Sequence, residues 1–128
     1  MKRKNITALY CRTAQESSYG IEAQMEILSR YANEQGYEEL AVYTDNGYSG
    51  LSLDRPGFAQ MQSDIDEGII KTVIVRNVDR ISRDKVVLFD WINDRLGDVH
   101  LISVLDGCDN KSVHLENNLK QLWLYFSK

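Results

Sequence analysis

The sequence predicts an α/β fold in which a largely parallel β-sheet is covered by helices on both faces. Strand-like and helix-like hydrophobic patterns alternate along the chain. The strand-like runs are nearly continuous in apolar residues, as buried parallel strands are, and polar segments follow them. The length of 128 residues fits one domain, residues 1–128, and no internal repeat or linker divides it.

The first half of the chain contains two predicted strands and two predicted helices. The apolar run at residues 6–11 predicts a strand, and apolar residues at helical spacing predict a helix from Ser18 to a C-cap at Gly36. Residues 40–43 form a second predicted strand, followed by a polar, glycine-bearing loop at residues 44–54. A second helix is expected from Pro56 to Gly68, with Asp54 or Arg55 as its N-cap.

The second half repeats this alternation. Residues 69–75 are β-branched and continuous, which predicts a strand, and a polar run follows them. A helix is expected at residues 82–96 and a fourth strand at residues 100–105.

A final helix is expected from Val113 to Phe126, with an apolar stripe along one side. The stripe either pairs two or more copies of the chain, as a homodimer or tetramer, or packs on its own sheet. The pattern favours neither alternative. Its members are Leu115, Leu119, Leu122, Trp123 and Phe126, with Tyr125 beside them.

Composition excludes several classes of protein. The chain has 15 basic and 19 acidic residues, a net charge of −4, which disfavours strong non-specific DNA binding by the whole surface. Cys11 and Cys108 are far apart and form no Cys-x-x-Cys pair, so we expect two reduced, buried thiols and neither a disulfide framework nor a zinc site. No apolar run is long enough to span a membrane, and the first residues do not resemble a signal peptide, so a cytoplasmic protein is expected.

Arginines gather after the predicted strands, where ligands of open α/β sheets bind. Guanidinium groups are planar and permanently charged, which suits the oxygens of a phosphate. For any single arginine, an ion pair on a solvated surface is the simpler explanation, but convergence at strand ends favours an anion site. The arginines concerned are five of the eight in the chain: Arg12, Arg55, Arg76, Arg80 and Arg83.

Other polar residues near these strand ends have supporting roles in this interpretation. Asp45 and Asp79 are expected to orient arginines. Neighbouring guanidinium groups would neutralise the two carboxylates, so too little negative charge would remain to bind a divalent metal ion, and none is expected. His100 and His114 are assigned to structure. No phosphate-binding Gly-x-x-x-x-Gly-Lys motif is present, and no cofactor is expected.

Five strings follow one another along the chain: Tyr10-Cys11-Arg12, residues 20–24, residues 43–50, residues 54–58 and residues 79–83. In their order and spacing they resemble the catalytic domain of the serine site-specific recombinases, the resolvase and invertase group with its large-recombinase relatives, over residues 6–107. The resemblance implies a three-layer α/β/α domain on a mixed, mostly parallel sheet of four or five strands. It implies DNA strand cleavage and rejoining through a phosphoserine link, without metal or nucleotide.

By the same resemblance, four arginines hold the scissile phosphate and four other residues support them. The phosphate ligands would be Arg12, Arg55, Arg80 and Arg83. The supporting residues would be Tyr10, Gln24, Asp45 and Asp79.

The sequence departs from this pattern at the nucleophile. Two residues after Arg12, where the pattern has its serine, this chain has Ala14, and alanine offers no hydroxyl for covalent catalysis. An engineered substitution, a natural non-cleaving relative, or a displaced nucleophile would each account for it. The displaced nucleophile would be Thr13, Ser17 or Ser18, and ranks last because near-attack geometry tolerates about an ångström of error.

A second departure is length. Family members continue through a long helix into a DNA-binding segment, and this sequence stops at Lys128, so we expect a catalytic domain truncated in that helix and lacking the part that reads DNA. Two other functions stay in consideration. One is a non-enzymatic dimerisation or regulatory module, and the other is a flavodoxin-like domain that binds a small phosphorylated molecule.

Overall fold

The computed structural model describes residues 5–110 and contains a five-stranded sheet with strand order β2-β1-β3-β4-β5. The first four strands in sequence are parallel, and β5 runs antiparallel to β4. The largely parallel sheet predicted from the residue patterns, and the mixed sheet that the resemblance implies, are therefore confirmed. The strands are β1 (Ile6–Thr13), β2 (Leu40–Asn46), β3 (Ile70–Val75), β4 (His100–Ser103) and β5 (Cys108–Asp109).

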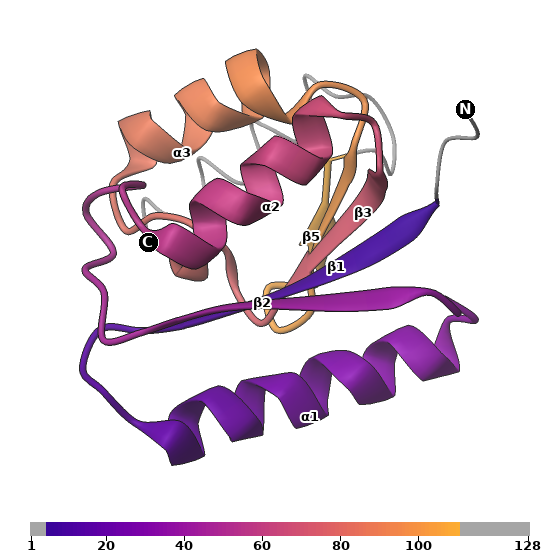
Figure 1. Cartoon of the computed structure of the whole chain (residues 1–128), viewed down its shortest axis with the longest axis horizontal. Helices are drawn as coiled ribbons and strands as arrows, with labels where there is room; N and C mark the ends of the chain where they lie inside the picture. Colours follow the sequence, from indigo (N-terminus) through magenta and orange to yellow (C-terminus); the bar gives the residue numbers. More distant parts are fainter. Residues whose placement is uncertain (1–4, 111–128) are drawn as a thin grey trace.

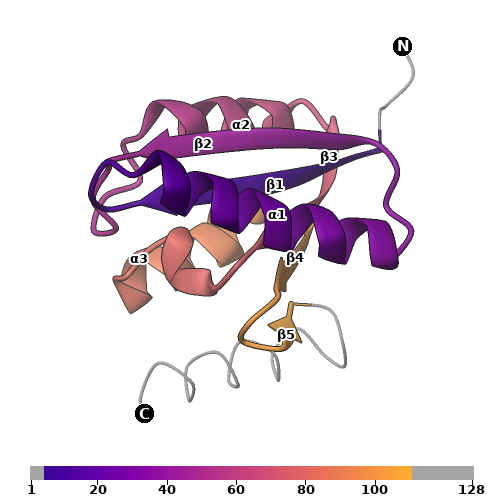
Figure 2. The same ribbon diagram turned by 90° about the horizontal axis from the view of Figure 1, so that it is seen from below.

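Helices cover both faces of the sheet, which gives the predicted three layers. Helix α1 (Ser18–Glu34) lies on one face, and α2 (Pro56–Asp66) and α3 (Lys85–Trp91) lie on the other (Figures 1 and 2). A 3₁₀ turn, η1 (Val78–Arg80), follows β3, and a π-helical turn, η2 (Ile92–Leu96), continues α3.

The period-two alternation of the strands divides the core between the two faces. Ala8 and Tyr10 of β1 belong to the cluster under α2 and α3, while Leu9 and Cys11 belong to the cluster under α1. Both clusters consist of buried residues, so β1 is a central strand covered on both sides. This burial fixes the register of β1 and hence the direction of every side chain at its carboxyl end.

Several element boundaries differ from the prediction. Strand β1 continues to Thr13 rather than ending at residue 11. Strand β2 continues through Asn46, because the side chains of Asp45 and Asn46 accept hydrogen bonds within the protein, from the Gly57 amide and the Thr13 hydroxyl, in place of water. Helix α3 begins at Lys85 rather than residue 82, because the Ser82 hydroxyl accepts from the Asp84 amide and Asp84 is the N-cap. Strand β4 ends at Ser103, and the chain turns at Gly107 (φ 65°) into β5, a two-residue strand that the sequence did not predict.

Several other predictions can be compared with the described residues. Helix α1 begins after the Ser17 N-cap, and Gly36 (φ 85°) follows its end, as expected. The Cys11 thiol is free and buried, as expected. The final helix, including His114, and the side chain of Cys108 lie outside what the structure describes. No helix among residues 5–110 is long and apolar enough to cross a membrane.

Candidate functional site

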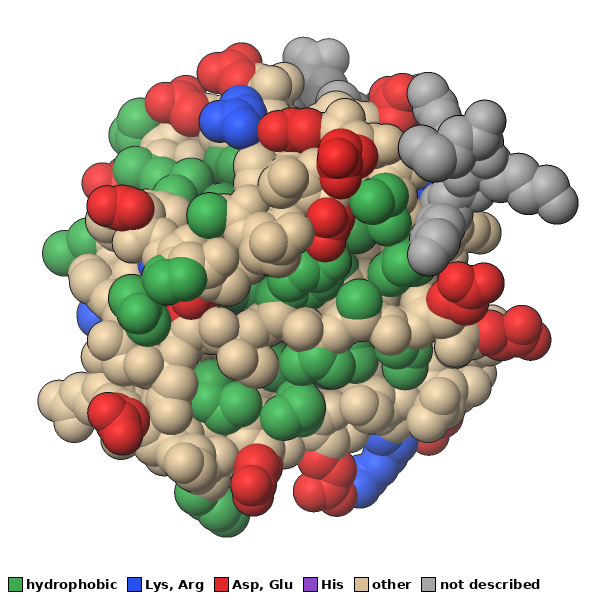
Figure 3. Space-filling view, viewed as in Figure 1, with side chains coloured by type: hydrophobic (Ala, Val, Ile, Leu, Met, Phe, Trp, Pro, Cys, Tyr) green, Lys and Arg blue, Asp and Glu red, His purple; other side chains and the backbone are tan. Residues whose placement is uncertain are grey.

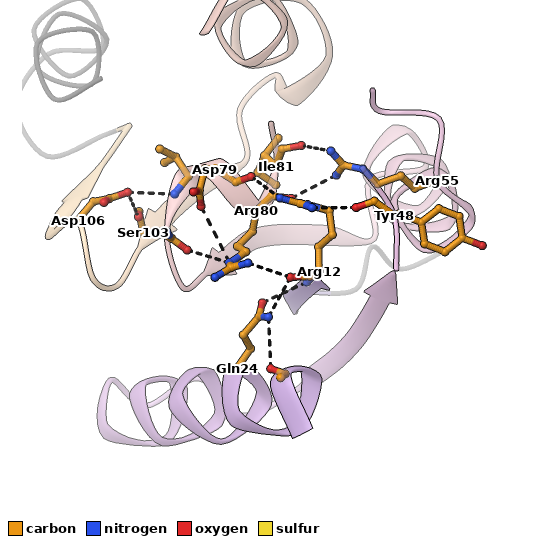
Figure 4. A network of polar contacts seen from close by, with 12 residues as sticks. Arg12, Gln24, Tyr48, Arg55, Asp79, Arg80, Ile81, Ser103 and Asp106 are labelled. Carbon is orange, nitrogen blue, oxygen red and sulfur yellow. Dashed lines mark hydrogen bonds and ion pairs between the residues drawn. The ribbon is translucent and has the colours of Figure 1, made fainter. Parts of the chain in front are cut away.

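Arg12 near the end of β1, Arg55 after β2 and Arg80 after β3 converge at the carboxyl edge of these strands (Figure 4). Strands β1 and β3 are neighbours in the sheet, and the chain leaves β1 toward α1 on one face and β3 toward α3 on the other. Such a switch point is where open α/β sheets bind ligands, because the loops diverge there. Arg12 pairs with Asp45 across β1 and β2, directly at this edge.

Arg12 lies at the centre of the cluster and is only 2% exposed. Its Nε donates to the carbonyl oxygen of Arg80 at 3.0 Å, Nη1 to that of Tyr48 at 2.8 Å, and Nη2 to that of Asp79 at 2.9 Å. The guanidinium group therefore joins the loop after β2 to the turn after β3.

Arg55, the last residue before α2, is 1% exposed and makes the same kind of junction. Its Nε donates to the carbonyl oxygen of Ser49 at 3.1 Å, and Nη2 donates to that of Ile81 at 2.6 Å. Nη1 donates to the carbonyl oxygen of Arg80 at 3.2 Å and to the Tyr10 hydroxyl at 3.1 Å. Both buried guanidinium groups are thus directed at main-chain carbonyl oxygens.

The other predicted arginines are more accessible. Arg80 Nη1 donates to the carbonyl oxygen of Arg12 at 3.2 Å, and its Nε donates to Asn77 Oδ1 at 3.0 Å. Arg83 is exposed, and its aliphatic stem lies against Gly50. Arg76 is half-buried just after β3. Arg80 and Arg83 are therefore more accessible to solvent than Arg12 and Arg55.

Gly50 holds the loop after β2 against the turn after β3. Its carbonyl oxygen accepts from the Arg83 amide at 2.8 Å and from the Ser82 hydroxyl at 3.3 Å. A Cβ atom at Gly50 would lie 2.7 Å from Arg83 Cδ and 2.8 Å from Arg12 Nη2. Glycine is therefore required here by close approach, and the two loops close over Arg12 and Arg55.

Tyr10 and Asp45 connect the cluster to α2. The Tyr10 hydroxyl donates to Asp45 Oδ2 at 2.6 Å, and the same carboxylate accepts from the amides of Gly57 and Phe58 at 2.7 and 2.8 Å. Arg55 occupies the N-cap position of α2, as one of the two expected residues, but its side chain makes no capping hydrogen bond. The Asp45 carboxylate, at the end of β2, accepts from the first amides of the helix instead. Burial raises the pKa of Tyr10, and the hydrogen bond to Asp45 raises it further, so Tyr10 stays a neutral donor.

Gln24 of α1 supports the main chain of Arg12. The Arg12 amide donates to Gln24 Oε1 at 3.1 Å, and Gln24 Nε2 donates to the Arg12 carbonyl oxygen at 2.9 Å. The side-chain amide thus pairs with the end of β1 as a neighbouring strand would. Gln24 positions Arg12 without contacting its guanidinium group.

Ala14 follows β1 directly, in an exposed bend. The bend is fastened by Asn46, whose Oδ1 accepts from the Thr13 hydroxyl at 2.7 Å and from the Ser17 amide at 2.8 Å. The Ser17 hydroxyl accepts from the Gly20 amide at 2.9 Å and caps α1. Asn46 was missed as a site residue; its position beside Asp45 in a polar run was the available signal.

The Asp79 carboxylate makes only a long ion pair with the neighbouring Arg80, which it was expected to orient. Asp79 Oδ1 is 4.0 Å from Arg80 Nε, and this buried oxygen accepts no hydrogen bond among the described residues. The main chain of Asp79 contributes more, because its carbonyl oxygen accepts from Arg12. The turn itself is fixed by Asp106, whose Oδ2 accepts from the Val78 amide at 3.0 Å and the Ser103 hydroxyl at 2.5 Å.

The electrostatics of the cluster favour an anion. Burial lowers the pKa of Arg12, and the neighbouring charge of Arg55 lowers it further, because each cation is held close to another in a dry environment. Carbonyl dipoles compensate part of this charge, and a phosphate with its negative oxygens would compensate more. No group of three or more His, Cys, Asp or Glu side chains within residues 5–110 could hold a metal ion.

The comparisons with known proteins agree with this geometry. The resolvase N-terminal domain family matches residues 7–117. The chain belongs to this family. The match covers all four arginines, Ala14 and the sheet edge described above.

Solved structures of serine recombinases have the same fold. The N-terminal catalytic domain of TP901-1 integrase superimposes with a TM-score of 0.83 at 27% identity, covering 96% of this chain and 95% of that domain. A resolvase family site-specific recombinase from Streptococcus pneumoniae superimposes with a TM-score of 0.73 at 28% identity, covering 97% of this chain and 87% of that chain. The predicted resemblance to serine recombinase catalytic domains is confirmed.

Two relatives are similar in sequence. A DNA recombinase relative of Bacillus subtilis (strain 168) is 32% identical over 97 residues, which are 70% of this chain and 19% of that protein. The chain therefore spans about a fifth of that recombinase's length. An uncharacterized immunity region protein 3 of Bacillus phage phi105 is 34% identical over 71 residues, which are 52% of this chain and 85% of that protein.

Proposed function

We propose that this chain is a serine recombinase catalytic domain that contacts DNA phosphate and assembles with other subunits but does not form a phosphoserine link. The observation that carries the proposal is the position of Ala14, on the exposed bend after β1 and two residues from Arg12. The arginine cluster of the family is thus present, and the attacking oxygen is missing. DNA would be the partner, and the cytoplasm the compartment in which they meet.

The hydroxyl groups nearest to Ala14 in sequence are already in use. The Thr13 hydroxyl donates to Asn46, in a side chain that is 8% exposed, and the Ser17 hydroxyl caps α1. Either would have to leave its partner and move the bend to reach a phosphate held by Arg12. Catalysis by Thr13 or Ser17 therefore conflicts with the local hydrogen bonds, and Ser18, four residues from Ala14, is the first residue of α1. We propose no displaced nucleophile.

Arg80 and Arg83 make the first phosphate contacts in this proposal. Arg12 and Arg55 are closed off by the carbonyl oxygens of Tyr48, Ser49 and Ile81, so they reach a phosphate only if the loops joined at Gly50 separate. Phosphate oxygens would then replace the carbonyl oxygens as acceptors. Each guanidinium group would exchange one set of charge-assisted hydrogen bonds for another. The exchange needs no metal ion or nucleotide.

The proposal is tested by restoring the missing hydroxyl. Ala14→Ser in the chain fused after Lys128 to a sequence-specific DNA-binding domain should form a covalent protein–DNA adduct on a nicked duplex bearing that domain's site. The matched control, Ala14→Thr, places a more hindered hydroxyl at the same position and should give far fewer adducts. Arg80→Ala in the Ala14→Ser background should abolish them. A folded Ala14→Ser fusion that binds its site and yields no adduct would contradict the phosphate assignment.

A second function, a non-cleaving regulatory module, is favoured by the same Ala14. The similarity to the immunity region protein 3 of phage phi105 supports it, because that relative is matched over 85% of its length by this domain alone. Such a module would act by joining recombinase subunits into assemblies that cannot cut. An Ala14→Ser chain that forms adducts freely would show that only the hydroxyl separates the two functions.

A further inference from the structure

A groove runs between α2 and the α3–η2 segment, on the face of the sheet opposite α1. Its volume of about 740 Å³ is within the range of functional binding pockets. Phe58 and Trp91, both buried, line it, and their ring centroids are 5.4 Å apart. The indole nitrogen of Trp91 donates to Gln62 Oε1 at 2.7 Å, which holds the ring between the two helices. The floor of the groove is therefore apolar and fixed.

The two walls of the groove present lining residues at the same helical spacing. Along α2 and its C-cap, the lining residues stand at Ala59 and three, four, seven and eight residues after it. Along α3 and η2, they stand at Val87 and at the same four intervals. Residues at these intervals share one face of a helix. Each wall is thus one helical face, and a third helix could pack its side chains against both faces at once.

The rim of the groove is acidic. Its exposed charges are four carboxylates and one guanidinium group, Arg95, which pairs with Asp66 at 3.4 Å. Helix α2 and η2 both end on this side, so their carboxyl ends add negative potential to that of the side chains. Figure 3 shows acidic side chains outnumbering basic ones over the part of the surface where α2 and α3 lie in Figure 1. The carboxylates are those of Asp66, Glu67, Asp90 and Asp94.

We propose that this groove binds an amphipathic helix of a partner protein, with an apolar face and flanking lysine or arginine side chains. The apolar face would cover Phe58, Trp91 and the short Ala59 side chain, and the cations would reach the carboxylates of the rim. The same negative rim disfavours an acidic segment and repels the phosphates of DNA. The groove is therefore a surface for a basic protein segment, distinct from the arginine edge.

The groove adjoins the arginine cluster through one ring. Phe58 lines the groove, and the centroid of its ring is 5.7 Å from Arg55 Cζ and 5.6 Å from the ring centroid of Tyr10. A bound partner helix would contact the same ring as Arg55. The inference concerns partner binding and goes beyond the proposed function, because its readout is peptide binding, whereas the phosphate assignment is read out by covalent adducts. Either can fail while the other stands.

The test measures the binding of two dye-labelled peptides to the full 128-residue chain, by fluorescence anisotropy at low salt. The probe is a peptide of about 14 residues, long enough to form a helix when bound, with leucines along one helical face and lysines elsewhere. The control peptide has glutamates in place of the lysines. We expect the leucine–lysine peptide to saturate the chain and the leucine–glutamate peptide to bind more weakly by about tenfold or more. The Nε1–H resonance of Trp91 should shift along the same saturation curve.

Two neighbouring substitutions on α2 locate the binding. Ala59→Trp fills the groove and should raise the dissociation constant of the leucine–lysine peptide about tenfold or more. Gln60→Trp places the same indole one residue further on, at an exposed position that does not line the groove, and should leave the constant within about twofold. Far-ultraviolet circular dichroism verifies the fold of both variants.

A third variant tests the charge of the rim. The double substitution Asp90→Asn and Asp94→Asn removes charge without filling the groove, so it should weaken peptide binding several-fold at low salt and little at high salt. Equal binding of the two peptides, or equal effects of Ala59→Trp and Gln60→Trp, would overturn the inference. Peptide binding that appears only after Leu119→Asp and Leu122→Asp would assign the groove to the chain's own terminal segment and would overturn it as well.

Discussion

Arg12 and Arg55 donate to the same acceptor, the main-chain carbonyl oxygen of Arg80, at 3.0 and 3.2 Å. Two positive side chains are thus buried around one oxygen at the carboxyl edge of the sheet. Like charges are expensive to hold together in a dry environment, and the carbonyl dipoles lower that cost without removing it. The arrangement is what a phosphate would complete.

Arg55→Ala should lower the free energy of unfolding by about 3 kcal/mol, because it leaves the buried carbonyl oxygens of Ser49 and Ile81 without donors. Urea denaturation measures the change. Arg30→Ala serves as the control, since its pair with Glu26 is exposed, 66% and 71% for the two side chains, and should contribute about 0.5 kcal/mol or less. An Arg55→Ala chain as stable as wild type would show that relief of charge repulsion outweighs the lost hydrogen bonds.

Gly50→Ala should separate the two loops that close over Arg12. The new methyl group would meet Arg83 Cδ at 2.7 Å and Arg12 Nη2 at 2.8 Å, so we expect a loss of about 1 to 2 kcal/mol. Amide hydrogen exchange at Arg83, which donates to the Gly50 carbonyl oxygen, should become faster. Leu51→Ala, at a 65% exposed position in the same loop, should change neither measurement.

Asn46→Ala should release the bend that carries Ala14. The substitution removes the acceptor of both the Thr13 hydroxyl and the Ser17 amide, at a cost of about 1.5 kcal/mol. Asn46→Asp retains an acceptor oxygen and should keep most of this stability. Hydrogen exchange at the Ser17 amide distinguishes the two variants, and equal protection in both would mean that the bend is held by other contacts.

Stability should fall at alkaline pH through the Cys11 thiol. Burial raises the pKa of Cys11 from 9.0 to about 12, with the charge of Arg80 acting in the opposite direction. A raised folded-state pKa means that stability is fully present below pH 9 and is lost as pH rises toward 12, by about 1.4 kcal/mol between pH 8 and pH 10. Between pH 8 and pH 10, the free energy of unfolding of Cys11→Ala should fall by about 1.4 kcal/mol less than that of wild type. Cys108→Ala should show the same fall as wild type. Identical slopes in Cys11→Ala and wild type would contradict the assignment.

The layers of the fold and the place of the site could be predicted from the sequence, because periodicity and strand-end position depend on local patterns. Arg12, Arg55 and Arg80 could be assigned to one edge for that reason. Their partners could not be predicted, since the acceptors are main-chain carbonyl oxygens of Tyr48, Ser49 and residues 79–81, which any sequence supplies. Side-chain identity carries no signal for such contacts.

The capping of α2 shows a second limit of sequence reasoning. Asp45 precedes the helix by eleven residues and reaches its amides only because β2 ends beside it, so no local capping pattern contains it. Strand β2 was predicted too short for the same reason, since a buried Asp45 at 1% exposure contradicts its ordinary preference for solvent. Tertiary hydrogen bonds decided both features.

Phosphate binding by the arginine cluster can be tested by following the Nε–Hε resonances of the arginines by NMR while a short DNA duplex is added at low salt. We expect the resonances of Arg12, Arg55, Arg80 and Arg83 to shift along one saturating curve, while those of the exposed Arg30 and Arg95 stay in place. Equal small shifts of all arginine resonances would contradict phosphate binding by the cluster. Unchanged resonances of Arg12 and Arg55, while those of the surface arginines shift, would contradict it as well.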